Sequence, residues 1–371
     1  MNAIDDFARH KLDQLDAERL TRVLRTVAPN EGPLNFCSND YLGLSQDPRV
    51  KQAAADAAMK YGAGAGASRL VTGNHPLYET LERKLAALKG TEAAVVFGSG
   101  YLANVGTIPV FASEGDLILT DELAHACMLT GAKLSGARVS IFRHNDTAHL
   151  GALLKEHRVT ARHCLILTEG VFSMDGDLAP LPEIARLARA HDAWMMTDYA
   201  HGLGVIGEGR GAAAHWGVRP DIQMGTLSKS AGAYGGFVAG SKPVIDLLIN
   251  RARSLIYATG LPPAVIAGAS AGIDIIAEDK ALCARPLARA RAFCAALNLP
   301  APESPIVPII LGGAEAALTA SAALERQGFL VTAIRPPTVP QGTARLRVTF
   351  TAAHSESDVA RLAAAIRPLI R

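Results

Sequence analysis

The sequence has 371 residues, with 37 basic and 35 acidic side chains, 49% hydrophobic residues and 19% charged residues. This composition is typical of a soluble globular α/β protein with a sizeable core, and it argues against a disordered chain. Because the charges nearly cancel, neither nucleic acid nor an anionic membrane is an expected partner.

The first 28 residues have the apolar spacing of a helix, and the turn-forming cluster at 29–33 ends that pattern. We therefore expect residues 1–44 to form an N-terminal arm. The chain starts without the apolar segment of a signal peptide, and no apolar run reaches the roughly 18–20 residues of a membrane span. These features predict a cytoplasmic protein.

Short apolar runs alternate with helix-like stretches between residues 45 and 261. The runs lie at 93–97, 117–120, 139–142, 164–168, 194–197, 222–224 and 237–239. Such alternation predicts βα units around a mostly parallel, buried sheet. Residues 45–261 are therefore expected to form a large domain.

The segment 262–280 is rich in Ala and Ile and is expected to form a linking helix. A smaller α+β domain is expected over 281–371. Its predicted strands are 306–311, 330–334 and 346–350, and its predicted helices lie near 281–297, 314–327 and 355–369. The overall prediction is an α/β protein with a large domain and a smaller C-terminal α+β domain.

The cysteines at positions 37, 127, 164, 283 and 294 show none of the spacings of metal ligands. Their odd number also argues against a disulfide framework. We expect reduced cysteines in the core and no metal site.

Polar residues directly after apolar runs are the first candidates for a binding site, because open parallel sheets bind ligands beyond the carboxyl ends of their strands. Gly100 and Tyr101 follow the first run and begin a helix, whose free N–H groups favour a phosphate. Asp198 ends another run, with His201 nearby. A buried carboxylate needs a cationic or hydrogen-bonding partner, and a protonated pyridine nitrogen is one such group. The structural alternative for Gly100 is a glycine turn that packs a helix on a strand. For Asp198 it is a cap of the next helix.

Lys229 lies among small and hydroxyl-bearing residues after a further apolar run. Most lysines are solvated surface charges, but a crowded, dry pocket lowers the pKa of an amine and makes it a nucleophile. His125 follows the run 117–120 and could stack on a flat ring held by that lysine. A hydrogen-bonded structural histidine is the alternative.

The order and spacing of Gly100, His125, Asp198, His201 and Lys229 resemble those of the fold type I enzymes that use pyridoxal 5'-phosphate (PLP). Over nearly its whole length the chain is similar to the α-oxoamine synthases. The matching stretches are 36–44 (FCSNDYLGL), 168–177 (TEGVFSMDGD), 198–207 (DYAHGLGVIG), 257–263 (YATGLPP) and 333–354 (AIRPPTVPQGTARLRVTFTAAH). This resemblance implies a PLP-dependent transferase, and a homodimer with its active site at the subunit interface.

The resemblance also implies roles for individual residues. Lys229 would bind the cofactor covalently and act as a base, Asp198 would keep the pyridine nitrogen protonated, and His125 would stack on the ring and contact substrate. His201 would hydrogen-bond the ring oxygen. The other implied cofactor contacts are Gly100, Tyr101, Ser173, Thr226 and, from the second subunit, Thr259.

For the substrates, the resemblance places Asn39 and Arg347 at the amino-acid carboxylate, for which a guanidinium is a suitable partner. Thr338 and Arg25 match positions near the substrate. The chain departs from residues common in the family at Tyr199, Leu203, Ser228 and Arg69, which leaves substrate preference and rate open.

The implied activity is an acyl transfer in which an amino acid condenses with an acyl thioester and loses carbon dioxide. Within the family the chain looks like members that use L-alanine and a pimeloyl thioester, carried by coenzyme A or by acyl carrier protein. Glycine or serine with another acyl donor is the nearest alternative. An aminotransferase or lyase would need no thioester, and a catalytically silent protein would bind the cofactor without turnover.

Overall fold

The computed structural model describes residues 2–18, 20–27 and 31–370. The chain divides into a first unit, Met1–Leu34, and a second unit, Asn35–Arg371. In the first unit the helix α1 spans Ala3–Ala17, and the Asn2 side chain caps it by accepting the N–H of Ile4.

The prediction of a helical pattern over residues 1–28 is only partly right. The chain has no helix over residues 20–27, while residues 1, 19 and 28 lie outside the described residues. The turns that would follow α1 contain the β-branched Thr21 and Val23, which form helix less readily. Val23 and Leu24 are also exposed, so burial of their side chains does not offset this.

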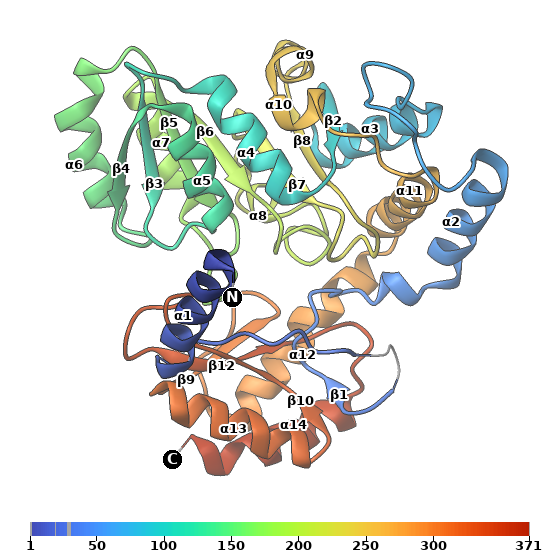
Figure 1. Cartoon of the computed structure of the whole chain (residues 1–371), viewed down its shortest axis with the longest axis vertical. Helices are drawn as coiled ribbons and strands as arrows, with labels where there is room; N and C mark the ends of the chain where they lie inside the picture. Colours follow the sequence, from blue (N-terminus) through green and yellow to red (C-terminus); the bar gives the residue numbers. More distant parts are fainter. Residues whose placement is uncertain (1, 19, 28–30, 371) are drawn as a thin grey trace. The chain divides into compact units, whose positions relative to one another are not determined.

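The second unit is built on a sheet with the strand order β2-β8-β7-β6-β5-β3-β4 in the described part of the chain (Figure 1). The strands are β2 (Ala93–Phe97), β3 (Leu117–Asp121), β4 (Arg138–Phe142), β5 (Cys164–Glu169), β6 (Trp194–Asp198), β7 (Ile222–Thr226) and β8 (Gly236–Gly240). Neighbouring strands are parallel except where β8 pairs antiparallel with β2 and β7. The prediction of a mostly parallel sheet is therefore confirmed.

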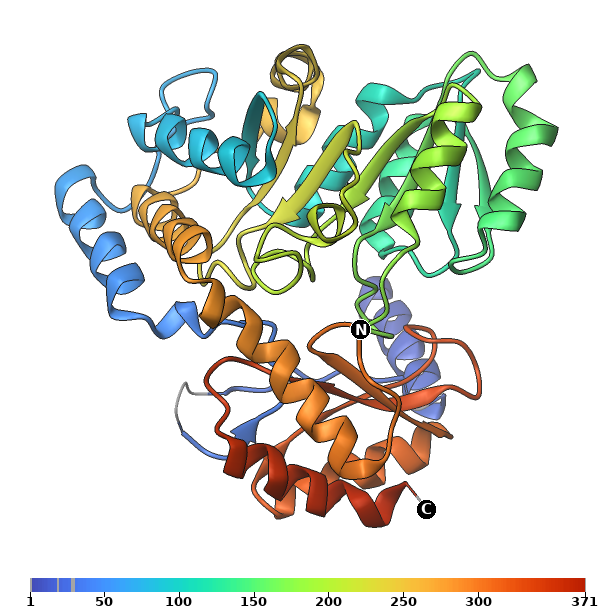
Figure 2. The ribbon, with the colours of Figure 1, turned by 180° about the vertical axis from the view of Figure 1, so that it is seen from behind.

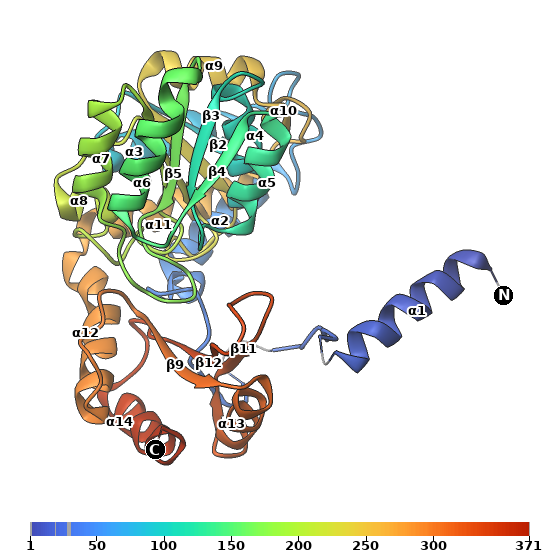
Figure 3. The ribbon, with the colours of Figure 1, turned by 90° about the vertical axis from the view of Figure 1, so that its left-hand side faces the viewer.

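Helices cover both faces of this sheet, as the edge-on view in Figure 3 shows. One core packs α4 (Gly100–Phe111), α5 (Ala126–Ser135) and α9 (Lys242–Arg251) against the sheet. The other core packs α3 (Pro76–Lys89), α6 (Thr147–His157), α7 (Leu181–Ala190), α8 (Ala212–Trp216) and α11 (Pro263–Glu278) against the opposite face. Every residue of β3 and β5 is buried, because neighbouring side chains point into the two cores in turn.

A second, three-stranded antiparallel sheet has the order β11-β12-β9 and consists of β9 (Ile306–Gly312), β11 (Thr332–Ile334) and β12 (Ala344–Thr349). The helix α12 (Lys280–Leu297) follows α11 and leads toward this sheet (Figure 2). The helix α13 (Ala314–Arg326) packs on the sheet, and α14 (Glu356–Ile366) packs on α12. The remaining elements are α2 (Pro48–Tyr61), α10 (Arg253–Ile256), β1 (Leu34–Asn35), β10 (Phe329–Leu330) and the 3-10 turns Leu44–Gln46, Arg158–Thr160 and Arg367–Leu369.

The predicted strand at 330–334 is divided in the structure. The carbonyl of Leu330 accepts the N–H of Phe36, whereas Thr332–Ile334 pairs with β12, so two different neighbours interrupt the strand. The predicted linking helix corresponds to α11, and Asp279 then caps α12 by accepting the N–H of Leu282. The division of the chain at residues 44, 261 and 280 stays a prediction.

All five cysteines are free, and Cys127, Cys164, Cys283 and Cys294 are buried as predicted, while Cys37 is half-buried. Among the described residues, no helix has both the length and the apolar character needed to cross a membrane.

Candidate functional site

The carboxyl ends of β5, β6 and β7 meet around a cavity of about 210 Å³. It is lined by the predicted cofactor residues Gly100, Tyr101, His125, Asp198, His201, Thr226 and Lys229. The first and the last of these residues are more than a hundred positions apart in the sequence. The parallel strands bring all of them to one edge of the sheet. A second cavity of about 510 Å³ shares His125 and contains the predicted residues Ser173 and Thr338.

Lys229 lies in the first cavity with its amine held against a histidine. Its Nζ is 2.6 Å from Nε2 of His201, whose Nδ1 is 2.7 Å from the hydroxyl of Tyr41. Burial lowers the pKa of Lys229 to about 8, although the carboxyl groups of Asp198 and Glu169 oppose this shift. Burial, and then the charge of Lys229, lowers the pKa of His201 well below its usual value. The lysine is therefore a nucleophilic amine close to neutral pH, beside an uncharged imidazole.

The lowered pKa of Lys229 predicts how the apoenzyme captures an aldehyde such as PLP. The neutral amine is the reactive form, so the capture rate should rise with pH and level off above a midpoint near 8. Stopped-flow absorbance after mixing apoenzyme with PLP measures this rate, with Nα-acetyl-lysine as the reference amine. A midpoint equal to that of the reference amine would contradict the prediction.

Asp198 ends β6 with both carboxylate oxygens engaged and only 4% of its surface exposed. Oδ1 accepts the N–H of Ala200 at 2.8 Å, and Oδ2 accepts the side-chain N–H of Asn104 at 2.8 Å. Asn104, buried within α4, also approaches Sγ of Cys127 at 3.0 Å. Asn104 was not predicted as a site residue, because a lone Asn inside a helix carries no motif.

His125 caps α5 and presents a neutral ring to both cavities. Its Nδ1 accepts the N–H of Cys127 at 3.3 Å, so the ring proton is assigned to Nε2. Burial lowers the pKa of His125, with Asp198 opposing and Lys229 adding to the shift. Its backbone N–H donates to Oε1 of Glu169 at 2.7 Å. Glu169 is a further buried cavity residue that sequence reasoning missed, and desolvation followed by the nearby Asp198 raises its pKa well above the usual value.

Gly100 lies at the start of α4, where the helix offers free N–H groups to the cavity. A Cβ added at Gly100 would lie 3.3 Å from Cβ of Thr226, so glycine allows the close approach of these two segments. The Thr226 hydroxyl donates to the carbonyl of Gly235 at 2.8 Å and accepts the N–H of Ser228. A helix N-terminus is a favourable phosphate site.

The residues of the first cavity fit PLP. The amine of Lys229 suits the aldehyde, the carboxylate of Asp198 suits the pyridine nitrogen, the ring of His125 suits stacking, and the start of α4 suits the phosphate.

Arg347 on β12 is buried at the predicted amino-acid site. Its Nε donates to the carbonyl of Ser173 at 2.6 Å, and Nη1 donates to Oδ1 of Asn39 at 3.1 Å. Among the described residues, Nη2 has no hydrogen-bond partner. A buried guanidinium with a free N–H is suited to a carboxylate ligand.

The remaining predicted residues are Thr259 and Arg25. Thr259 is exposed and lines neither cavity, and its predicted contribution is to the site of a second subunit. Arg25 belongs to the first unit and lies in a segment without helix or strand. Its role stays a prediction.

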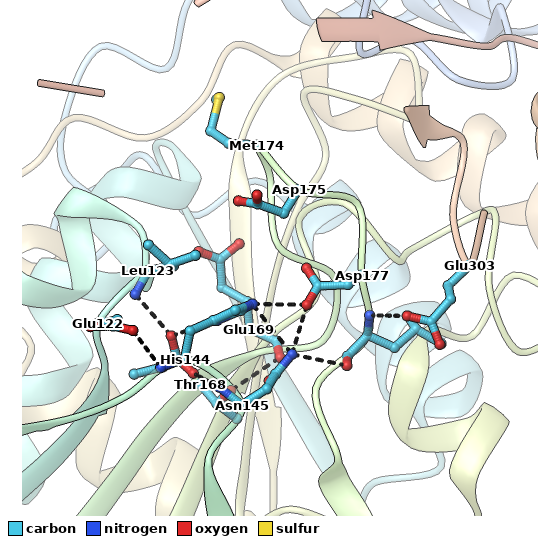
Figure 4. A network of polar contacts seen from close by, with 12 residues as sticks. Glu122, Leu123, His144, Asn145, Thr168, Glu169, Met174, Asp175, Asp177 and Glu303 are labelled. Carbon is cyan, nitrogen blue, oxygen red and sulfur yellow. Dashed lines mark hydrogen bonds and ion pairs between the residues drawn. The ribbon is translucent and has the colours of Figure 1, made fainter. Parts of the chain in front are cut away.

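A polar network surrounds His144, directly after β4 (Figure 4). The ring nitrogens of His144 lie 3.0 Å from Oδ1 of Asp121 and 2.8 Å from Oδ2 of Asp177. Asn145 donates to both aspartates as well. This network connects the segment after β3 to the segment after β5, and sequence reasoning did not identify it.

Comparison with known proteins places the chain in a family. The model of the family "Aminotransferase class I and II" matches residues 31–366. A putative 8-amino-7-oxononanoate synthase of Parvibaculum lavamentivorans is 58% identical, covering 100% of this chain and 98% of the relative. The 8-amino-7-oxononanoate synthase of Maricaulis maris is 57% identical, covering 100% and 97%. The chain belongs to the 8-amino-7-oxononanoate synthase family.

Solved structures agree with this family and with the predicted fold type I. A serine palmitoyltransferase from S. paucimobilis with bound PLP has a TM-score of 0.91 at 29% identity, covering 100% of this chain and 99% of that one. An 8-amino-7-oxononanoate synthase from Francisella tularensis has a TM-score of 0.77 at 26% identity, covering 91% and 97%. The predicted resemblance to the α-oxoamine synthases is confirmed.

Proposed function

We propose that this PLP-dependent acyltransferase condenses L-alanine with a pimeloyl thioester, giving 8-amino-7-oxononanoate, carbon dioxide and a free thiol. Its identity of 55–59% to 8-amino-7-oxononanoate synthases supports this reaction. The observation that carries the proposal is the placing of Lys229, Asp198 and His125 around one cavity, with Arg347 and a larger cavity beside it.

PLP, when bound, supplies a ring that takes up the electron pair left as a bond to the amino-acid Cα breaks. Lys229 would hold the cofactor through Nζ. As a free amine with a lowered pKa, Nζ would accept the proton from Cα of the amino acid. His201, 2.6 Å away and oriented by Tyr41, holds Nζ toward the cavity.

Asp198 maintains the positive charge on the pyridine nitrogen, and the N–H groups of Ala200 and Asn104 fix the direction of its carboxylate. His125, as an uncharged imidazole, would stack on the ring. Arg347 binds the carboxylate of the amino acid through its free N–H, and Asn39 holds the guanidinium in place.

The larger cavity receives the acyl donor. It shares His125 with the cofactor cavity, and Thr338 is among its lining residues. Its lining includes Leu129, Phe172 and Val339, which suit an aliphatic chain.

The test is mass detection of product after mixing holoenzyme, L-alanine and pimeloyl coenzyme A. We expect 8-amino-7-oxononanoate only when both substrates are present. Product from glycine or serine but not from L-alanine would instead indicate another α-oxoamine synthase, and turnover without thioester would indicate an aminotransferase or lyase. Bound cofactor with no product from any pair would indicate a silent binding protein.

The proposal extends to a homodimer in which Thr259 of the partner subunit reaches the cofactor phosphate. Its support is the family resemblance, together with the exposure of Thr259 away from the cavities of its own chain. Acyl carrier protein is a second proposed carrier of the pimeloyl group. The cytoplasmic location stays a prediction.

A further inference from the structure

The His144-Asn145 pair connects two loops that both line the larger cavity. We propose that His144 is a positioning residue that, as a cation between two carboxylates, sets the spacing of these loops for the acyl donor. This inference rests on the proposed function, which assigns the larger cavity to the acyl thioester.

The two loops follow neighbouring strands of the main sheet. One loop, here taken as 121–126, runs from the last residue of β3 to the first residue of α5, and its residues 122–126 line the cavity. The other, 170–178, connects β5 to α7, and its residues 172–175 line the same cavity. Strands β3 and β5 are paired, but both loops continue beyond that pairing. The distance between the two loops therefore depends on contacts made by side chains.

His144 joins these loops through both of its ring nitrogens. Nδ1 lies 3.0 Å from Oδ1 of the fully buried Asp121, and Nε2 lies 2.8 Å from Oδ2 of Asp177 (Figure 4). A ring that faces a carboxylate at each nitrogen must donate from both, and only the imidazolium does so. Burial acts to lower the pKa of His144, but the hydrogen bonds to Asp121 and Asp177 outweigh it and raise the pKa to about 10.

Asn145 and the backbone reinforce the same connection. The N–H of Asn145 donates to Oδ2 of Asp121 at 2.9 Å, and its Nδ2 donates to Oδ2 of Asp177 at 2.7 Å. Asn145 has a φ of 54°, in the left-handed region that asparagine tolerates better than most residues. The N–H of His144 also donates to Oε1 of Glu122, a cavity residue, at 2.7 Å.

The loop 170–178 also has hydrogen bonds to β12 of the small sheet. Arg345 donates to Oδ1 of Asp175 at 2.5 Å, and Arg347 donates to the carbonyl of Ser173. Without the positive charge of His144, repulsion between the carboxylates of Asp121 and Asp177 would weaken the connection that Asn145 still makes, and the loops would be held less firmly. The cofactor cavity has its own supports, because Asn104 holds Asp198 and Glu169 holds the N–H of His125. A change at His144 should therefore affect the acyl donor much more than the amino acid.

The test compares His144→Gln and Asp177→Asn with the control His149→Gln in the holoenzyme. His149 is a nearby histidine on α6 whose ring accepts the N–H of Arg143 and which lines neither cavity. For the first two variants we expect the KM for pimeloyl coenzyme A to rise about tenfold or more, since small misplacements cost large factors. The KM for L-alanine should stay within about twofold, as should both constants of the control.

An unchanged KM for the acyl donor, or an equal rise for both substrates, would overturn the inference. Hydrogen–deuterium exchange gives a second readout that needs no turnover: peptides covering 121–126 and 170–178 should exchange faster in His144→Gln. Unchanged exchange there, or faster exchange throughout the chain, would also overturn it. A wild-type enzyme that makes no product contradicts the proposed function instead, and the exchange measurement still decides the role of His144.

Discussion

Lys229→Ala should lower the rate of product formation by about 10⁴-fold or more, because one change removes both the covalent attachment of the cofactor and the base at Cα. The visible absorbance that arises when the cofactor is attached to the lysine should disappear as well. The measurement is product formation from L-alanine and pimeloyl coenzyme A, together with the absorbance spectrum.

The matched control is Lys242→Ala, which removes an exposed lysine that pairs with Asp246 and lines neither cavity. This control should retain normal turnover and absorbance. Lys229→Ala should remain folded, as judged by circular dichroism, since it leaves the sheet and both cores intact. Turnover near the wild-type level in Lys229→Ala would refute the assigned role.

Asp198→Asn should reduce turnover by roughly 10³-fold while PLP still binds. The amide has the same shape and can still accept the N–H of Ala200, but it lacks the negative charge that keeps the pyridine nitrogen protonated. Steady-state kinetics with saturating cofactor measure this loss.

Asp221→Asn is the control for this variant, because Asp221 accepts the N–H of Met195 on the same strand β6 and lines neither cavity. The control should keep turnover within about a factor of three, as expected of a change away from the reacting groups. Equal losses in the two variants would show that Asp198 acts only through the stability of the strand.

The main sheet was predictable because its strands are buried on both faces. Each strand therefore appears in the sequence as a short apolar run between polar helices, and β2 spans the predicted residues 93–97. The predicted helices and strands are wrong where packing in the folded chain, and not the local apolar pattern, decides the secondary structure. The helical spacing of residues 20–27 forms no helix, because the side chains of Val23 and Leu24 stay exposed, and the run 330–334 is divided between two neighbouring segments.

The site was predictable where a polar residue directly follows a strand, as Asp198 and Lys229 show. The missed residues act through contacts that no local pattern reveals. Asn104 reaches Asp198 across 94 positions, and Tyr41 reaches His201 across 160. His144 was missed for the same reason, because its carboxylate partners follow two other strands.

Borohydride reduction of the holoenzyme, followed by peptide mass spectrometry, shows which residue carries the cofactor. Reduction makes the bond between the amine and PLP permanent. If Lys229 carries the cofactor, we expect a phosphopyridoxyl group on the peptide that contains Lys229 and on no other. The same group on a different lysine such as Lys89, or on none, would contradict it.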